Sequence, residues 1–362
     1  MMITGVRSTV SQSRVRAVLV AMWVLAAAPL TPSVARAQAS IEPVAPWSFA
    51  PPLDNKKEAE NISGVACAPA GASADPARGC LLVSDEVSGD GRRYVRFFAV
   101  EDGAHELKLG STLELLPASI PDEADVEGAD FDGGRFYVVG SHGLSKGEPP
   151  KRQPSRFHVY RFRPDAQAAA QVERGSLEAL LAGLPEGIGE HACTAARWER
   201  RPGEAPCKTL QEHGLNIEGL AVRDRHLYLG FRAPVLDGRA FIVRVAADAA
   251  FASAEARPEV FALRLGPGVG VRDLARVEGG LLVLTGPELP ESDGQTGRAQ
   301  IVFWREDGTL RRLGPLGGMR PDEKPEALLV LGEDAQGYRV LVMSDGTDKG
   351  AGGRPTEYRV PK

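Results

Sequence analysis

An internal repeat constrains the fold of this sequence more than any other feature, because it occurs five times. Each copy has a short strand starting with E-G or an equivalent, a turn rich in Gly or Asp, and an apolar strand with polar residues at its end. The copies are NISGVACAP with GCLLVSDE, DVEGADFDGG with RFYVVGSHG, NIEGLAVRD with HLYLGFRAP, GVRDLARVEGG with LLVLTGPE, and KPEALLVLGED with YRVLVMSDG. A third strand candidate follows each copy, and often a fourth. Four short strands repeated at roughly 40 to 55 residues are typical of β-propeller blades.

Aligned on their first strands, the copies share one column, which holds Ser63, Glu127, Glu218, Arg272 and Glu326. The intervals between these residues are 64, 91, 54 and 54 residues. We therefore predict an all-β chain forming a propeller of five four-stranded blades. The fifth copy ends with the chain, so the N-terminal segment PWSFAPPL is expected to supply its outer strand and close the ring. A β-sandwich or barrel would leave the five matched copies unexplained.

The 91-residue interval is too long for one blade. It contains SLEALLAGL at 176–184, the one stretch that reads clearly as a helix, and two of the four cysteines. We interpret it as a partly helical insertion at about 166–214. A sixth blade within this interval is the alternative.

The first 37 residues have the pattern of a secretory signal peptide. Arg7, Arg14 and Arg16 precede an apolar run at 17–30, and small residues of an A-x-A cleavage site follow at Ala35 and Ala37 or at Ala37 and Ala39. The run is shorter than the roughly 20 residues that span a bilayer. We expect the mature chain, residues 38–362, to be a single propeller domain in the periplasm or secreted, without membrane insertion.

Loss of the signal peptide makes the chain more acidic. The formal charge changes from −5 to −9, because the segment holds four Arg and no acidic residue. An acidic chain is not expected to bind nucleic acid or an anionic membrane surface. We expect a monomer that takes a small-molecule or anionic substrate and uses no nucleotide cofactor.

The four cysteines form two local pairs, Cys67 with Cys80 and Cys193 with Cys207, separated by 13 and 14 residues. An even number of cysteines in an exported chain indicates disulfides. Neither pair has the C-x-x-C spacing of a zinc or redox site. We therefore predict one disulfide within each pair.

Propeller topology brings two sets of polar residues to one face, because the start of each first strand meets the end of the second. The strand starts hold Asn61, Ser63, Asp125, Glu127, Asn216, Glu218, Arg272, Asp273 and Glu326. The strand ends hold Asp85, Glu86, Ser141, His142, Arg232, Glu288 and Asp345. Crowded carboxylates need a cation, protons or a metal ion, and hard oxygen ligands favour Ca²⁺ or a similar divalent cation.

Roles can be assigned on this basis. We expect Asp85, Glu127, Glu218 and Asp345 to be metal ligands. His142 would be the acid or base, and Arg232 and Arg272 would contact an anion or oxyanion. The remaining candidates are expected to bind the ligand: Asp125, Ser141, Asn216, Asp273 and Glu326.

Purely structural roles remain open for the same residues. An acidic strand start can accept backbone N–H groups from the next blade, and the glycines of the E-G pairs can serve close strand packing near the axis. His142 can simply bond a neighbouring blade. The basic patch KRQPSR at 151–156 is expected to be a solvated loop rather than a steering site for an anionic ligand.

The motifs NIEGLA, GFRAP and GVRDL resemble those of a bacterial family defined as a domain of unknown function. Its pattern is D-x-E-G with G-S-H, N-I-E-G-L-A with G-x-R-x-P, then G-I-R-D-L and a closing S-D-G. The matching residues are Asp125, Glu127, Gly128, Ser141, His142, Asn216, Glu218, Gly219, Arg232, Pro234, Arg272, Asp273, Ser344 and Asp345. The resemblance covers most of the mature chain. It implies a propeller, similar in outline to secreted propellers described as phytase-like or esterase-like, and implies no reaction.

Two functions follow from these patterns. The first is hydrolysis of an ester, lactone or phosphate ester, assisted by a divalent cation at the charged face. The second is non-catalytic binding of a ligand or protein at the same face, with the arginines carrying specificity. The sequence leaves open whether the chain is an enzyme.

Overall fold

The structure is a computed structural model of the chain. It describes residues 38–53, 61–72, 74–85, 94–117, 119–120, 123–199, 207–252, 257–289, 299–320, 323–346 and 354–362. The predicted signal peptide at 1–37 and Glu86 lie outside these residues. Among the described helices, none is long and apolar enough to cross a membrane.

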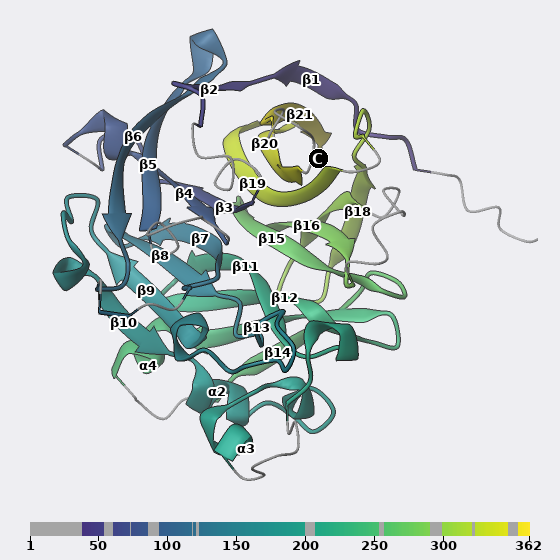
Figure 1. The fold of residues 1–362 in the computed structure, drawn as a ribbon. Helices are drawn as coiled ribbons and strands as arrows, with labels where there is room; N and C mark the ends of the chain where they lie inside the picture. Colours follow the sequence, from purple (N-terminus) through teal and green to yellow (C-terminus); the bar gives the residue numbers. More distant parts are fainter. Residues whose placement is uncertain are drawn as a thin grey trace, which may run out of the picture. The chain divides into compact units, whose positions relative to one another are not determined.

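The described strands form five sheets, antiparallel except for one N-terminal strand, which follow one another around a ring in chain order (Figure 1). The first contains β3 (Ile62–Cys67), β4 (Cys80–Ser84), β5 (Tyr94–Glu101) and β6 (Glu106–Glu114), and the second contains β7 (Val126–Asp132), β8 (Arg135–Gly140), β9 (His158–Phe162) and β10 (Glu173–Ser176). The third contains β11 (Asn216–Arg223), β12 (His226–Leu236), β13 (Arg239–Ala246) and β14 (Glu259–Arg264). The fourth contains β15 (Val269–Val277), β16 (Gly280–Pro287), β17 (Gln300–Trp304) and β18 (Leu310–Pro315), and the fifth contains β19 (Glu323–Asp334), β20 (Gly337–Gly346) and β21 (Thr356–Pro361). The predicted five-bladed propeller is confirmed.

The N-terminal segment closes the ring, but through other residues than expected. β1 (Pro43–Pro46) pairs with β21 as the outer strand of the fifth blade. β2 (Ser48–Ala50), within the predicted segment PWSFAPPL, adds instead to β6 of the first blade in parallel. Trp47 lies between the two strands, is buried, and donates from Nε1 to Glu357 on β21 at 3.0 Å. This short segment therefore ties the last blade to the first.

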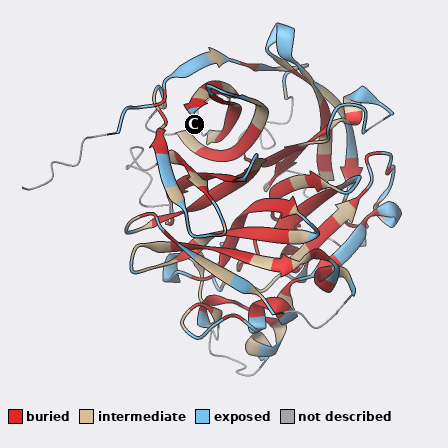
Figure 2. Ribbon diagram, turned by 180° about the vertical axis from the view of Figure 1, so that it is seen from behind, coloured by how far each residue is buried: buried red, intermediate tan, exposed pale blue. Residues whose placement is uncertain are grey.

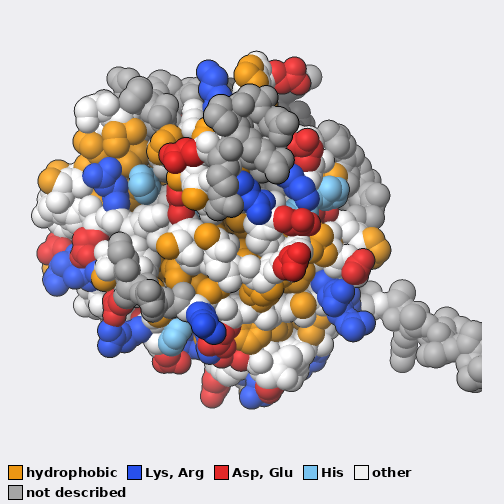
Figure 3. All heavy atoms as spheres, turned by 90° about the horizontal axis from the view of Figure 1, so that it is seen from below, with side chains coloured by type: hydrophobic (Ala, Val, Ile, Leu, Met, Phe, Trp, Pro, Cys, Tyr) orange, Lys and Arg blue, Asp and Glu red, His pale blue; other side chains and the backbone are white. Residues whose placement is uncertain are grey.

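The apolar core is divided into layers between the blades. Five clusters of buried side chains join neighbouring sheets, including the pair formed by the fifth blade and the first. The inner strands are therefore buried on both faces (Figure 2), as their nearly continuous apolar sequences require. Outside the core, acidic and basic side chains are interspersed on the face seen in Figure 3.

The insertion follows the outer strand of the second blade. It contains α2 (Glu178–Ala182) and α3 (Ala195–Glu199), while α4 (Ala247–Ala252) lies in the third blade. β10 lies within the range of 166–214 expected for the insertion, so the part of that range outside the blade's sheet begins only at residue 177. The sheets of the described residues number five, and none of them is a sixth blade within this interval.

Both predicted disulfides are present. Cys67 and Cys80 join β3 to β4 inside the first blade, and Cys193 and Cys207 join two parts of the insertion.

Candidate functional site

A β-bulge at the same place in every blade positions the candidate site. The pairing of the first and second strands skips one residue in each blade, and the skipped residues are those of the aligned column: Ser63, Glu127, Glu218, Arg272 and Glu326. A bulge leaves one residue unpaired and redirects its side chain. All five side chains line one cavity of about 350 Å³.

Glycine after the bulge lets the inner strands approach closely near the axis. A Cβ on Gly64 would lie 2.4 Å from the backbone oxygen of Glu127. A Cβ on Gly128 would lie 2.6 Å from the backbone oxygen of Glu218. These distances are too short for any side chain, so the E-G pair serves packing through its glycine and lines the cavity through its acid.

The strand ends complete the cavity, as the topology predicts. Nine of the twelve predicted site residues line it: Asp85, Asp125, Glu127, Asn216, Glu218, Arg232, Arg272, Glu326 and Asp345. His142, Ser141 and Asp273 do not. The described lining also includes residues that the sequence argument did not assign to the site, namely Lys146, Arg156 and Lys324 and, at the end of the insertion and just after it, Thr209, Leu210, Gln211 and Leu215.

Three carboxylates form a cluster where the first two blades meet. One oxygen each of Asp85, Asp125 and Glu127 lies within 4.8 Å of the other two. Burial, together with Glu218, Asp125 and Asp85, raises the pKa of Glu127 well above its usual range, and Arg232 only partly opposes this. The carboxylate of Glu127 has no hydrogen bond or ion pair within the described part of the chain. It is a buried acid that either holds a proton or requires a cation.

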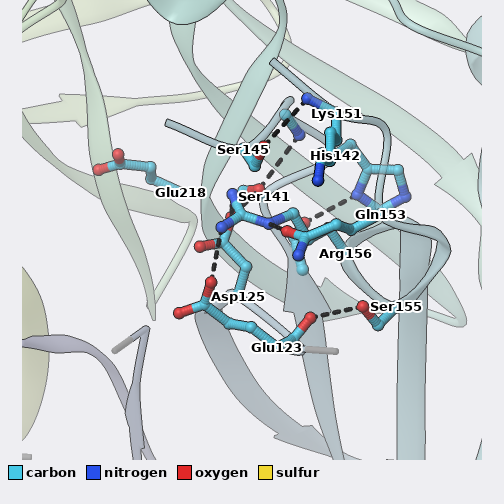
Figure 4. Close-up of polar contacts among 12 residues, drawn as sticks. Glu123, Asp125, Ser141, His142, Ser145, Lys151, Gln153, Ser155, Arg156 and Glu218 are labelled. Atoms are coloured by element: carbon cyan, nitrogen blue, oxygen red, sulfur yellow. Dashed lines mark hydrogen bonds and ion pairs between the residues drawn. The ribbon is translucent and has the colours of Figure 1, made fainter. Parts of the chain in front are cut away.

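Asp125 belongs to the cluster but also has partners of its own (Figure 4). Arg156 donates to it at 2.7 Å and to Glu123 at 2.7 Å, and Ser141 donates to it through its hydroxyl. Arg156 is buried, although the sequence pattern predicts that its segment is a solvated loop. Arg156 could have been identified from the sequence, because Asp125 at a buried strand start requires a cation and Arg156 lies in the same blade.

A second group of charges lies across the cavity and is internally paired. Glu218 accepts from Arg232 at 2.9 Å and forms an ion pair with Arg272 at 3.1 Å. Arg272 also pairs with Glu326. Burial and the nearby Arg232 lower the pKa of Arg272 to about 10, so it remains cationic at neutral pH. Glu218, predicted as a metal ligand, is therefore placed between two guanidinium groups rather than in the cluster.

Asp345, the fourth predicted metal ligand, also lies outside the cluster. Burial raises its pKa, while Lys324, Arg272 and Lys146 oppose the rise. Its neighbours are thus mainly cations. The predicted set of four ligands divides into Asp85 and Glu127 in the cluster, and Glu218 and Asp345 among the basic groups.

His142 is not in the cavity. Its ring is 1 % exposed, bonds the backbone oxygen of Gly140 at 2.8 Å, and packs edge-on against Phe157. In Figure 4 the ring points away from Glu218 and the carboxylates. Burial lowers its pKa to about 4, so it is neutral at pH 7. This position gives no support to the expected role as acid, base or ligand at the cavity.

Asp273 has the structural role that the sequence left open. Its two oxygens accept from the backbone N–H of Leu274 and of Leu328, each at 2.7 Å, and Leu328 lies in the next blade. Asp130 makes an equivalent bond to Val222 at 2.6 Å between the second and third blades. Ser141 is likewise fully buried.

The charges that line the cavity nearly cancel. The described lining residues include six carboxylates and five cationic side chains, a formal net charge of −1. Three of these carboxylates belong to the cluster of Asp85, Asp125 and Glu127, in which Asp125 pairs with Arg156. Carboxylate oxygens in this arrangement are suited to a hard divalent cation.

The chain is distantly similar to several solved structures. A chain of a nidogen/laminin complex is 12 % identical, with 82 % of this chain and 83 % of that one covered and a TM-score of 0.40. An exo-β-1,3-galactanase of Phanerochaete chrysosporium is 8 % identical, with 88 % and 65 % covered and a TM-score of 0.48. The β-propeller domain of Nup133 from Vanderwaltozyma polyspora is 8 % identical, with 83 % and 71 % covered and a TM-score of 0.33.

No curated protein matches the sequence. Residues 77–196 and 206–354, well over half of the chain, match one family, and these ranges contain the carboxylate cluster, the paired arginines and most of the insertion. The predicted membership of a family defined as a domain of unknown function is thereby confirmed. The chain belongs to the family described as protein of unknown function (DUF3616).

Proposed function

We propose that the chain is a hydrolase that binds a divalent cation through Asp85, Asp125 and Glu127 and cleaves an ester, lactone or phosphate ester in the adjoining cavity. The observation that carries the proposal is the buried, unpaired carboxylate of Glu127 within 4.8 Å of two further carboxylates. A divalent cation at this point would relieve the repulsion among the three acids.

The donor set fits a hard cation. All three groups offer oxygen, the ligand that Ca²⁺, Mg²⁺ and Mn²⁺ prefer. Asn216 lines the same cavity, and its buried Oδ1 has no hydrogen-bond partner among the described residues. It adds a neutral oxygen that could serve a cation or a bound water molecule.

A bound cation would supply Lewis acidity and a more acidic water molecule. The protein's part is to orient the substrate. Arg232, with its side chain 13 % exposed, faces the cavity and is suited to an anionic or developing oxyanion group. Arg272, at 2 % exposure and paired with two acids, is suited to holding Glu218 and Glu326 in place.

The rival function is cation-dependent binding without catalysis. It is favoured by the position of His142, since the described residues that line the cavity include no histidine or cysteine to move a proton. Proton transfer in hydrolysis would then depend on cation-bound water and on carboxylates of the lining such as Asp345. Turnover by the cation-loaded protein separates the two functions.

Calorimetric titration with CaCl₂, MgCl₂ and MnCl₂ tests the cation site. We expect one site per chain, lost in Glu127→Gln and retained in Asp345→Asn, a matched carboxylate that lines the cavity outside the cluster. Loss of binding in Asp345→Asn with retention in Glu127→Gln would refute the ligand set.

With p-nitrophenyl acetate and p-nitrophenyl phosphate, EDTA should abolish turnover of whichever substrate is cleaved. Binding without turnover of any ester would leave the rival function.

The proposed setting is outside the cytoplasm, as a monomer. The two disulfides within the described residues are consistent with an oxidising compartment. N-terminal sequencing of the protein recovered from the periplasm or culture medium should give Gln38 as the first residue. An intact N-terminus would contradict cleavage.

A further inference from the structure

The lining of the cavity is divided by origin into charged and uncharged parts. Blade strands supply most of the charged groups. Four residues at the end of the insertion and just after it, Thr209, Leu210, Gln211 and Leu215, are all uncharged. Leu144, in the loop after β8, also lines the cavity. Three leucines therefore face the space that the acids and arginines also face.

The apolar side of the cavity is held in place by specific contacts, and we call its three leucines, Leu144, Leu210 and Leu215, the leucine wall. The disulfide between Cys193 and Cys207 joins two parts of the insertion, and Leu144 packs against both cysteines and Phe157. The backbone N–H of Leu215 donates to His191 at 2.9 Å.

The turn at 209–213 is held on both sides. Thr209 donates to Glu212 through both its backbone N–H and its hydroxyl, each at 2.9 Å. His213 lies 2.8 Å from Glu288 at the end of the fourth blade's second strand. Leu210, in this turn, is thus presented to the cavity by contacts at each end.

Leu210 differs from the other two leucines in exposure. Leu144 and Leu215 are buried, whereas Leu210 is half-buried and keeps apolar surface at the cavity. When a ligand removes apolar surface in a cavity from water, the free energy of binding becomes more favourable. The volume of about 350 Å³ is in the range of sites for small molecules.

We infer that Leu210 is a specificity-determining residue and that the substrate is a carboxylic ester or lactone carrying a short aliphatic group, which packs on the leucine wall. The inference rests on the proposed hydrolase function. A phosphate monoester fits less well, because its two negative charges would add to the formal charge of −1 of the described lining, whereas Arg232 is suited to the single charge of a developing oxyanion.

The test is kcat/KM for p-nitrophenyl acetate, butyrate and hexanoate in CaCl₂, with p-nitrophenyl phosphate alongside. We expect a rise of about threefold to fourfold per added methylene until the cavity is filled, and little or no cleavage of the phosphate. Leu210→Ala should flatten the rise. Leu310→Ala, a half-buried leucine outside the cavity, should leave it unchanged. Leu210→Asn, checked by its melting temperature, serves if Leu210→Ala does not fold.

Three results separate this inference from the proposed function. A flat series in the wild type, or preference for the phosphate, overturns the inference while hydrolysis stands. An unchanged slope in both Leu210 variants overturns the role of that residue. If nothing is cleaved, hydrolysis fails. The leucine wall is then tested by calorimetry with acetate, butyrate and hexanoate, whose affinities should increase with length in the wild type and not in Leu210→Ala.

Discussion

Glu127 and Glu218 occupy equivalent positions in neighbouring blades, yet they have opposite surroundings. Both are bulge residues, both precede glycine, and both line the same cavity. Glu218 is held between Arg232 and Arg272, while Glu127 has carboxylates beside it and no partner among the described residues. The repeat thus determines the position of each acidic side chain. The residues of adjacent blades determine whether its charged form is stabilised or destabilised.

Removal of the Arg272 side chain should disrupt the ion pairs around Glu218 and have the largest effect on the free energy of unfolding. Arg272→Met leaves Glu218 and Glu326 buried with less compensation, so we expect a loss of about 3–5 kcal/mol in the free energy of unfolding. Urea denaturation at pH 7 measures it. Arg163→Met, at an ion pair with Asp165 in which both side chains are mostly exposed, is the control and should change little. A loss below 1 kcal/mol, as is typical of exposed ion pairs, would contradict the paired network.

His142 should give the next largest effect, through pH. Its pKa is lowered to about 4 in the fold, so the unfolded chain takes up a proton that the buried ring does not. Stability from this group is full above pH 6.5 and is lost as pH falls towards 4, by up to about 3 kcal/mol. His142→Gln should remove this dependence, and half-exposed His226→Gln should retain it. Denaturation curves at pH 7, 5.5 and 4.5 give the free energy of unfolding of the wild type and both variants. An equal dependence of this free energy on pH in all three proteins would contradict the burial of His142.

The two glutamates themselves provide the direct comparison. In cation-free protein, Glu127→Gln should raise the free energy of unfolding at pH 7 by about 1–3 kcal/mol, because an unpaired buried charge is removed. Since the pKa of Glu127 is raised in the fold, the folded chain holds a proton that the unfolded chain loses above pH 4.5. The gain should therefore vanish below pH 4.5 and grow as pH rises above it.

Glu218→Gln should act in the opposite direction, because it unpairs Arg232 and Arg272. A loss of stability in both glutamine variants would mean that Glu127 has a favourable partner after all.

The smallest effect is expected at Asp345. Its surroundings are cationic, so Asp345→Asn should change the Kd for Ca²⁺ less than threefold while Glu127→Gln abolishes binding. A change of tenfold or more would place Asp345 among the ligands.

Much of the fold followed from local patterns. Short apolar strands, Gly- and Asp-rich turns and a repeated column predicted five blades, since each pattern is a property of neighbouring residues. The closing strand was placed slightly too late because Pro43–Pro46 carries no strand signal and pairs only across the ring with β21. Arg156 was assigned to a solvated loop because its carboxylate partners, Glu123 and Asp125, lie about 30 residues earlier in the chain.

The sequence by itself indicated nine residues that line the cavity, because strand starts and strand ends must meet at one face of a propeller. Only the tertiary structure decided their charge environments. Whether an acid finds a guanidinium group or another acid depends on contacts between blades and on loops far apart in sequence, as with Glu218 and Glu127. His142 shows the same limit: it ends the strand expected to reach the site, but its left-handed backbone, with φ of 57°, accompanies a ring buried against Phe157 instead.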